Sequence, residues 1–323
     1  MFAKLSRWLN GDDKHRVLFY RDFRQYTGGH QKVADYFRHC QLRPGLAPAI
    51  SFSDSSVWDN TNPWLAVRSK ITAFTPSNYN WLFLAGLDWQ RYRQSGIDPK
   101  LPVINLIQHV RHAEPTSDVY PFLTERALRI CVSKEVEDAI RATGRVNGPV
   151  VTIANGHAVP QQPVDREYDV FILGVKQPGL AKLLTQSLQL QLGLSVAVVH
   201  EQTPRAEVLA YMACSRVSVV LPNHTEGFYL PALESMALSD VTVVPDCIGN
   251  RSFCFDGINC LMPVLELEPL VRAVQEALAI TKDKPRLRAL KRAAHIQLKE
   301  HSLERERQQF YKLLDDLPAL WAR

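Results

Sequence analysis

Short apolar runs rich in β-branched residues recur along this chain, and segments with helical periodicity separate them. The first series comprises 17–20, 49–52, 81–85, 103–107, 130–132 and 150–153, and the second comprises 170–173, 194–199, 217–220 and 241–244. Runs of this kind are typical of parallel strands that are buried on both faces of a sheet. Two successive series that alternate with helices predict an α/β fold of two doubly wound, Rossmann-like domains.

A segment without periodicity separates the two series. It runs from Gly156 to Arg166 and contains Pro160 and Pro163, which is typical of a linker. We therefore expect an N-terminal domain over 1–158, a linker over 159–166 and a second domain over 167–300. Residues 301–323 have apolar side chains at helical spacing, including Leu303 and Phe310, and we expect a C-terminal helix there.

Length and composition exclude several classes of protein. A chain of 323 residues with 46% hydrophobic and 22% charged residues is long enough for two cores. It has no uninterrupted apolar stretch of about 18 residues and no secretory signal at its start. Its six cysteines lack the paired spacing of a zinc site, and it has no acidic D-x-D cluster. We expect a cytoplasmic protein with reduced thiols and no bound metal.

The net charge of +5 is unevenly distributed. Between Lys282 and Lys299, seven basic residues stand against one acid, an excess of six positive charges. A basic helix surface suits an anionic membrane or nucleic acid, and a solvated helix face is the plainer alternative. Apolar residues between Phe2 and Leu9 would likewise form an interfacial anchor or pack on their own domain. No nucleic-acid motif with interleaved aromatics occurs, so we expect no nucleic-acid partner and leave peripheral contact with the inner membrane face open.

The segment LPNHTEGFYLPALESM, from Leu221 to Met236, is the most informative about function. It follows an apolar run and opens a helix, with Pro231 in the first turn. The unsatisfied amides and positive dipole end of that helix would suit a diphosphate. Glu226 and Glu234 are eight positions apart and can face one ligand, although Glu234 alone could simply stabilise the first helical turn. The amides concerned belong to Gly227, Phe228, Tyr229 and Leu230.

This segment resembles the E-x7-E signature of the retaining glycosyltransferases of family four. Further on, Pro245, Gly249 and Asn250 resemble the strand and glycine turn of that family, and 256–261 resembles its D-G-x-N-G-L segment with Cys260 replacing a glycine. The resemblance implies the GT-B architecture, in which two Rossmann-like domains face a central cleft and the final helix crosses back to the first domain. It also implies retaining transfer of a sugar from a nucleoside diphosphate sugar to an acceptor.

By the same resemblance, Glu226 would bind the sugar hydroxyls of the donor and Glu234 the ribose hydroxyls. Carboxylates suit both roles, because each can accept from two adjacent hydroxyls. The sequence departs from the family after the first strand of the second domain, where GVKQPG at 174–179 lacks the usual arginine. We assign Lys176 to the diphosphate, with Lys182 and Arg205 as alternatives.

In the first domain, Gly28 and Gly29 resemble the family's glycine-rich loop after the first strand. Backbone without side chains can approach phosphate or sugar closely, and a plain turn is the alternative. His109 stands where the family has a histidine at the reaction centre, and its imidazole would donate a hydrogen bond to the donor sugar. His112 competes for that role, and a histidine that merely caps a strand end is the other alternative.

The acceptor is the least determined part. Trp58, Asn60 and Trp64 could stack on and hydrogen-bond a saccharide, with His112 nearby in the same site, or could equally serve packing and turns. The resemblance implies a metal-independent enzyme whose co-substrate is a nucleotide sugar and whose acceptor is a saccharide or a lipid-linked glycan of bacterial envelope polysaccharide. A catalytically silent sugar-nucleotide-binding subunit is the alternative that the missing arginine favours.

Overall fold

The computed structural model describes residues 15–160 and 164–322, and its contacts divide the chain into two units. The first unit extends to Ala154 and takes in the chain again from Glu306, and the second unit is Asn155–Arg305. The predicted linker over 159–166 stays a prediction, since 161–163 fall outside the described residues. So do the apolar residues between Phe2 and Leu9.

The first unit is built on a six-stranded parallel sheet in the order β2-β1-β3-β4-β5-β6. Every residue of β3 and β4 is buried, as expected for central strands of a sheet that is covered on both faces. The six predicted runs all lie within or next to these strands, which confirms the predicted sheet. The strands are β1 (His15–Arg21), β2 (Leu46–Phe52), β3 (Trp81–Ala85), β4 (Val103–Ile107), β5 (Leu128–Cys131) and β6 (Val150–Thr152).

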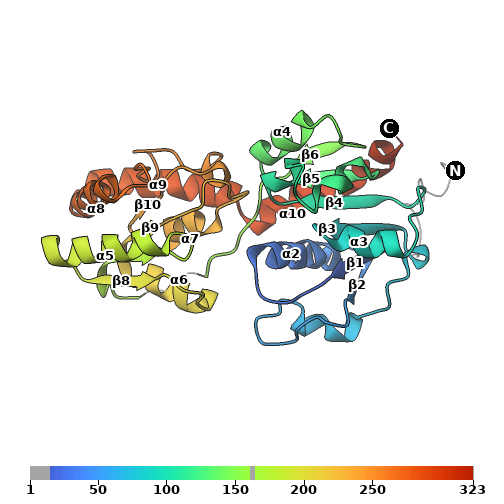
Figure 1. The fold of residues 1–323 in the computed structure, drawn as a ribbon, viewed down its shortest axis with the longest axis horizontal. Helices are drawn as coiled ribbons and strands as arrows, with labels where there is room; N and C mark the ends of the chain where they lie inside the picture. Colours follow the sequence, from blue (N-terminus) through green and yellow to red (C-terminus); the bar gives the residue numbers. More distant parts are fainter. Residues whose placement is uncertain (1–14, 161–163, 323) are drawn as a thin grey trace. The chain divides into compact units, whose positions relative to one another are not determined.

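Helices cover both faces of this sheet (Figure 1). On one face, Leu82 and Leu84 share a core with Trp89 of α3. On the other, Phe83 stacks on Phe19 at 4.7 Å between ring centroids and lies among residues of α2 and α10. The helices of this unit are α2 (Gly28–Leu42), α3 (Asp88–Gln94) and α4 (Lys134–Ala142), with 3-10 turns η2 (Leu65–Lys70), η3 (Pro76–Asn78), η4 (Val110–Ala113) and η5 (Tyr120–Thr124).

The last helix, α10 (Leu303–Trp321), belongs to the first unit from Glu306 onward. Phe310 is fully buried, with its ring centroid 4.9 Å from that of Tyr36 in α2. Glu306 is also buried, and it accepts hydrogen bonds from Lys32 at 2.9 Å and bonds His39 at 2.8 Å. The prediction that the C-terminal helix returns to the first domain is confirmed.

The second unit has a four-stranded parallel sheet in the order β10-β9-β7-β8. Side chains alternate along β7, with Phe171 in a core beside α6 and α7 and with Val170 and Ile172 in a core beside α5 and α8. The strands are β7 (Tyr168–Leu173), β8 (Val196–Val199), β9 (Ser215–Val220) and β10 (Val241–Val243). The helices are α5 (Pro178–Leu192), α6 (Arg205–Ala213), α7 (Leu230–Leu238), η6 (Ile248–Asn250), α8 (Leu267–Lys282) and α9 (Lys284–Glu300).

Two Rossmann-like units, each with helices on both faces of a parallel sheet, confirm the predicted α/β class. Across the described residues, no helix is both long and apolar enough to cross a bilayer.

Candidate functional site

In the second unit, the loop between β9 and α7 presents backbone amides at the start of α7. The Tyr229 N–H donates to the Gly249 carbonyl at 2.9 Å, and the Leu230 N–H donates to the Phe228 carbonyl at 3.2 Å. The N–H groups of Gly227 and Phe228 have no acceptor among the described residues. Of the four amides that the sequence predicts for a diphosphate, two are therefore used within the protein, and the role of the other two toward a diphosphate stays a prediction.

The segment after β10 fixes the shape of this loop. A Cβ on Gly249 would lie only 2.7 Å from the Glu226 carbonyl oxygen and 2.7 Å from the Phe228 nitrogen, so only glycine fits there without displacing backbone. The Asn250 side chain accepts from the Cys247 N–H at 3.1 Å and donates to the Pro245 carbonyl at 2.9 Å. The predicted glycine turn is thus the support on which the 226–228 backbone rests.

Lys176 lies beside Glu226. It occupies the turn between β7 and α5, and its Nζ is 3.6 Å from Glu226 Oε1. The Lys176 side chain is half exposed and the Glu226 side chain is mostly buried. The turn is tight, because a Cβ on Gly174 would lie 2.1 Å from the Ala181 Cβ. The cation that the sequence assigned to a diphosphate is therefore held next to the first glutamate of the E-x7-E motif.

Glu234 is buried in α7 and forms an ionic cluster with two partners. Its Oε1 lies 2.9 Å from His157 Nε2 and accepts from Arg205 Nε at 2.8 Å. Arg205 Nη2 is also 2.9 Å from His157 Nε2, which donates to Glu234 or accepts from Arg205 depending on its tautomer. Burial by itself raises the pKa of Glu234, but the hydrogen bond with His157 and the charges of both partners outweigh burial and hold it below the usual value. Glu234 is therefore ionised at neutral pH.

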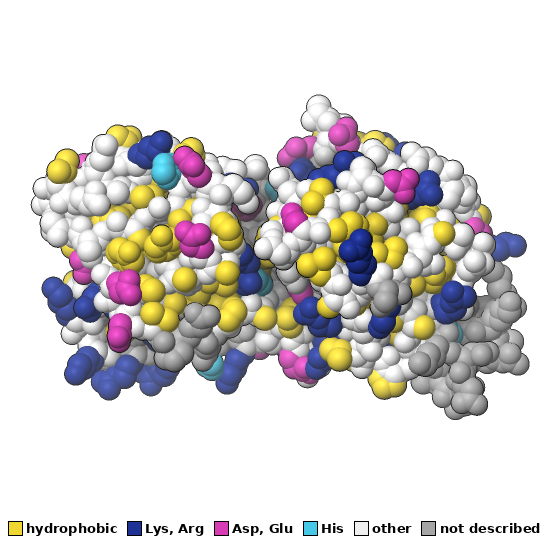
Figure 2. All heavy atoms as spheres, turned by 90° about the horizontal axis from the view of Figure 1, so that it is seen from below, with side chains coloured by type: hydrophobic (Ala, Val, Ile, Leu, Met, Phe, Trp, Pro, Cys, Tyr) yellow, Lys and Arg dark blue, Asp and Glu magenta, His cyan; other side chains and the backbone are white. Residues whose placement is uncertain are grey.

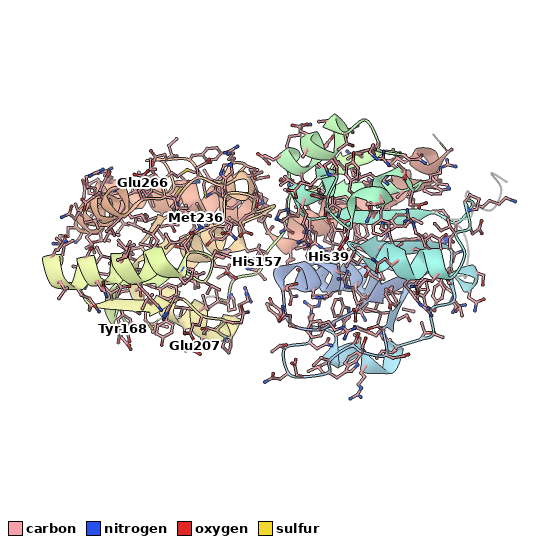
Figure 3. The ribbon with its side chains drawn as sticks, in the orientation of Figure 1. His39, His157, Tyr168, Glu207, Met236 and Glu266 are labelled. Atoms are coloured by element: carbon pink, nitrogen blue, oxygen red, sulfur yellow. The ribbon has the colours of Figure 1, made fainter. Side chains whose placement is uncertain are left out.

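His157 is the member of this cluster that sequence reasoning missed. It lies on the segment before β7 (Figure 3), 77 positions from Glu234 in the chain. No local pattern points to it. Arg205, at the start of α6, pairs with Glu234 and donates to the Ala158 carbonyl at 3.1 Å, and its role toward the diphosphate stays a prediction.

In the first unit, Gly28 and Gly29 form the start of α2, and Thr27 caps the helix by accepting from the His30 N–H at 3.3 Å. The side chain of Gln108 donates to the Gly29 carbonyl at 3.3 Å, and a Cβ on Gly29 would contact it at 3.4 Å. The glycines therefore stand at a helix N-terminus, and their role toward phosphate or sugar stays a prediction.

His109 follows β4 and caps η4. Its Nδ1 accepts from the Arg111 N–H at 3.0 Å, which leaves the neutral ring's proton on Nε2. His112 is buried, donates from Nδ1 to the His109 carbonyl at 3.0 Å, and has its pKa lowered to about 4 by burial. His112 thus holds the His109 backbone, and the assignment of His109 to the reaction centre stays a prediction.

The predicted acceptor residues differ in accessibility. Trp64 is only 1% exposed and packs on Phe52 at 5.6 Å between ring centroids, which favours the packing alternative for this side chain. Trp58 is half-buried, edge-on to Phe52 at 4.6 Å and with the Arg68 guanidinium 5.4 Å from its ring centroid. Asn60 is exposed. Trp58 and Asn60 thus keep the acceptor role as a prediction.

Comparison with known proteins rests on structure alone, since no family profile and no curated protein sequence matches this chain. Sucrose-phosphate synthase of Thermosynechococcus elongatus is 14% identical and superposes with a TM-score of 0.68 over 95% of this chain and 100% of its own. The HepE protein of Anabaena, solved with UDP-glucose, is 14% identical with a TM-score of 0.69 over 93% and 99%. This chain has the GT-B fold. A Rickettsia africae glycosyltransferase shares this GT-B fold at 12% identity, with a TM-score of 0.66 over 94% of this chain and 98% of its own.

Proposed function

We propose that this chain is a glycosyltransferase that uses a nucleoside diphosphate sugar, retains the configuration of the transferred sugar and needs no metal ion. The observation that carries the proposal is the site at the start of α7, where the free amides of Gly227 and Phe228 lie between Glu226 and Glu234. The two carboxylates can accept hydrogen bonds from hydroxyl groups, and the two N–H groups between them can donate to phosphate. A sugar nucleotide requires both kinds of partner.

Each part of the donor has a proposed partner. Glu226 accepts from the sugar hydroxyls and Glu234 from the ribose hydroxyls. Lys176 and the amides of 227–228 take the diphosphate. HepE was solved with UDP-glucose, and a protein with the same fold is named as a UDP-forming trehalose-phosphate synthase. UDP sugars are therefore the first donors to test.

The proposed chemistry needs charge stabilisation more than an enzymatic nucleophile. As the bond to the leaving diphosphate breaks, Lys176 and the two amides stabilise the charge that develops on it. His109 Nε2–H supports the donor sugar, and the leaving diphosphate itself accepts the proton of the attacking acceptor hydroxyl. Atoms and charge balance without an enzymatic carboxylate attacking the sugar. The proposed acceptor is a saccharide or a lipid-linked glycan of envelope polysaccharide.

A catalytically silent sugar-nucleotide-binding subunit is the second candidate, because the phosphate loop at 174–179 has one cation, Lys176, and no arginine. Both candidates bind the donor, and only an enzyme turns it over.

Measurement of donor turnover distinguishes the glycosyltransferase from the silent binding subunit. The protein is incubated with UDP, GDP, ADP and dTDP sugars in EDTA, and released nucleoside diphosphate is measured by mass spectrometry, with proton NMR recording the anomer of the released sugar. We expect slow hydrolysis of one donor class with retained configuration, and a rate about 100-fold lower in His109→Ala. The exposed His295→Ala serves as the control, with an unchanged rate. Binding without turnover would favour the silent subunit, and inversion would contradict the proposed mechanism.

A further inference from the structure

The outer face of α9 carries a stripe of cations. Lys284, Arg288, Arg292 and Lys299 recur at spacings of four, four and seven residues, which places them on one side of the helix. All four are exposed. The opposite side of the helix is anchored in the second unit by Leu290 and Ala294, which are buried. The stripe extends over about 22 Å at 1.5 Å per residue.

The four stripe cations are unpaired among the described residues, since none takes part in an ion pair or a side-chain hydrogen bond there. Other cations of α9 are engaged. Arg286 pairs with Glu276 of α8 at 2.5 Å, and Lys291 turns inward to donate to the Met236 and Ser239 carbonyls at 3.0 and 2.6 Å. The space-filling view also shows Lys and Arg side chains gathered along one margin of the second unit (Figure 2). The stripe therefore offers positive charge that the protein itself does not neutralise.

An apolar side chain lies next to the stripe. Ile296, four residues after Arg292, is 59% exposed and has no place in either core of the second unit. Long cationic side chains around an apolar one suit the boundary between anionic headgroups and acyl chains. The phosphates of a nucleic acid would pair with the cations, but an exposed isoleucine would add nothing to their binding. The side chains thus favour a lipid surface over a nucleic acid.

We propose that the outer face of α9 docks on an anionic lipid surface through Lys284, Arg288, Arg292 and Lys299, with Ile296 entering the headgroup region. The attraction is electrostatic at first approach and is screened by salt. This binding does not depend on the proposed transferase activity. It would hold the second unit at the membrane whether or not a donor is present.

Vesicle co-sedimentation tests the docking. The whole protein is mixed with vesicles of phosphatidylcholine alone or with 30% phosphatidylglycerol, in 0.1 M and 0.5 M salt. Since one cation near an anionic surface is worth about a fivefold change in binding, Arg288→Gln/Arg292→Gln/Lys299→Gln should lower partitioning on the order of 100-fold. Ile296→Ser should lower it by several-fold at 0.1 M salt.

A matched control removes three exposed cations from the first unit, Arg38→Gln/Lys100→Gln/Lys312→Gln, which changes the net charge equally. We expect this variant to bind phosphatidylglycerol vesicles within about twofold of the wild type. Equal losses in both triple variants would overturn the proposal, because binding would then follow net charge alone. Failure of the wild type to bind anionic vesicles would also overturn it, as would stripe-dependent binding of a labelled DNA or RNA duplex in place of vesicles. Circular dichroism checks that each variant is folded.

Discussion

At the scale of single residues, Gly249 shows how a position without a side chain controls the candidate site. The carbonyl of Glu226 and the amide nitrogen of Phe228 would each lie 2.7 Å from a Cβ at this position. Both belong to the backbone, which cannot rotate out of the way as the end of a side chain can. The 226–228 loop and its two free amides therefore depend on this glycine.

We predict that Gly249→Ala lowers donor affinity at least tenfold and destabilises the fold by roughly 1–3 kcal/mol, because the added methyl group displaces the 226–228 backbone. Urea unfolding and titration with the donor measure the two effects. Gly179→Ala is the control for the unfolding measurement alone, since a Cβ on Gly179, in α5, meets nothing within 4 Å and should leave stability equal or about 0.5–1 kcal/mol higher. Similar behaviour of the two variants would contradict the proposed role of Gly249.

Local sequence pointed to some residues of the candidate site but not to the contacts that others make, for physical reasons. Glu226, Gly249 and Lys176 stand in turns, and the residues beside them in the sequence are enough to indicate their roles. His157 and Arg205 meet Glu234 only after folding, so no spacing reveals their cluster. For Trp64, the sequence suggested a ligand contact that burial makes less favourable. An aromatic residue in a polar loop looks available for stacking on a ligand until its burial is known.

At the scale of elements, hydrophobic periodicity predicted the strands and α10 well, because each is buried along a continuous face. It did not predict the polar contacts between elements. Glu306 of α10 lies fully buried against Lys32 and His39 of α2, about 270 positions away along the chain. His39 appears on α2 in Figure 3. In sequence, these residues look like ordinary polar positions of two amphipathic helices.

We predict that Glu306→Gln lowers the free energy of unfolding of the protein by about 3–5 kcal/mol at pH 7, because it leaves the buried Lys32 ammonium without its full counter-charge. Burial alone raises the pKa of Glu306, and the charge of Lys32 and the hydrogen bond from His39 lower it below its usual value. A carboxyl whose pKa is lower in the folded state stabilises the fold above its unfolded pKa of about 4.3, and that stabilisation is lost as pH falls through the folded pKa.

Urea unfolding of the wild type and Glu306→Gln at pH 7 and pH 3.5 measures this dependence. The gap between the two proteins should be widest at pH 7 and narrower at pH 3.5. Exposed Glu304→Gln, on the same helix, is the control and should change stability by less than about 0.5 kcal/mol. A gap that widens in acid would contradict the assigned ionisation of Glu306.

At the scale of the whole molecule, the sequence predicted two Rossmann-like units from two series of apolar runs, most of them followed by a helix. The resemblance of the E-x7-E segment then indicated the GT-B version of that arrangement. Structural similarity at 12–14% identity supports the same fold. Fold is retained at such identities because the pattern of buried positions survives when the residues that fill them change. Donor and acceptor preferences depend on a few exposed side chains, which the pattern does not constrain.

The central claim is that the start of α7 in the second unit binds a nucleoside diphosphate sugar. The most direct measurement is ligand-detected NMR of the protein with UDP, GDP, ADP and dTDP sugars, without added metal, for wild type, Glu234→Gln and Glu207→Gln. Glu207 is an exposed acid on α6, two positions after Arg205 in sequence but outside the cluster. We predict that one nucleotide class binds the wild type and Glu207→Gln equally, and that Glu234→Gln weakens binding at least tenfold through lost hydrogen bonds to the ribose. Absence of binding to any donor, or binding that Glu234→Gln leaves unchanged, would contradict it.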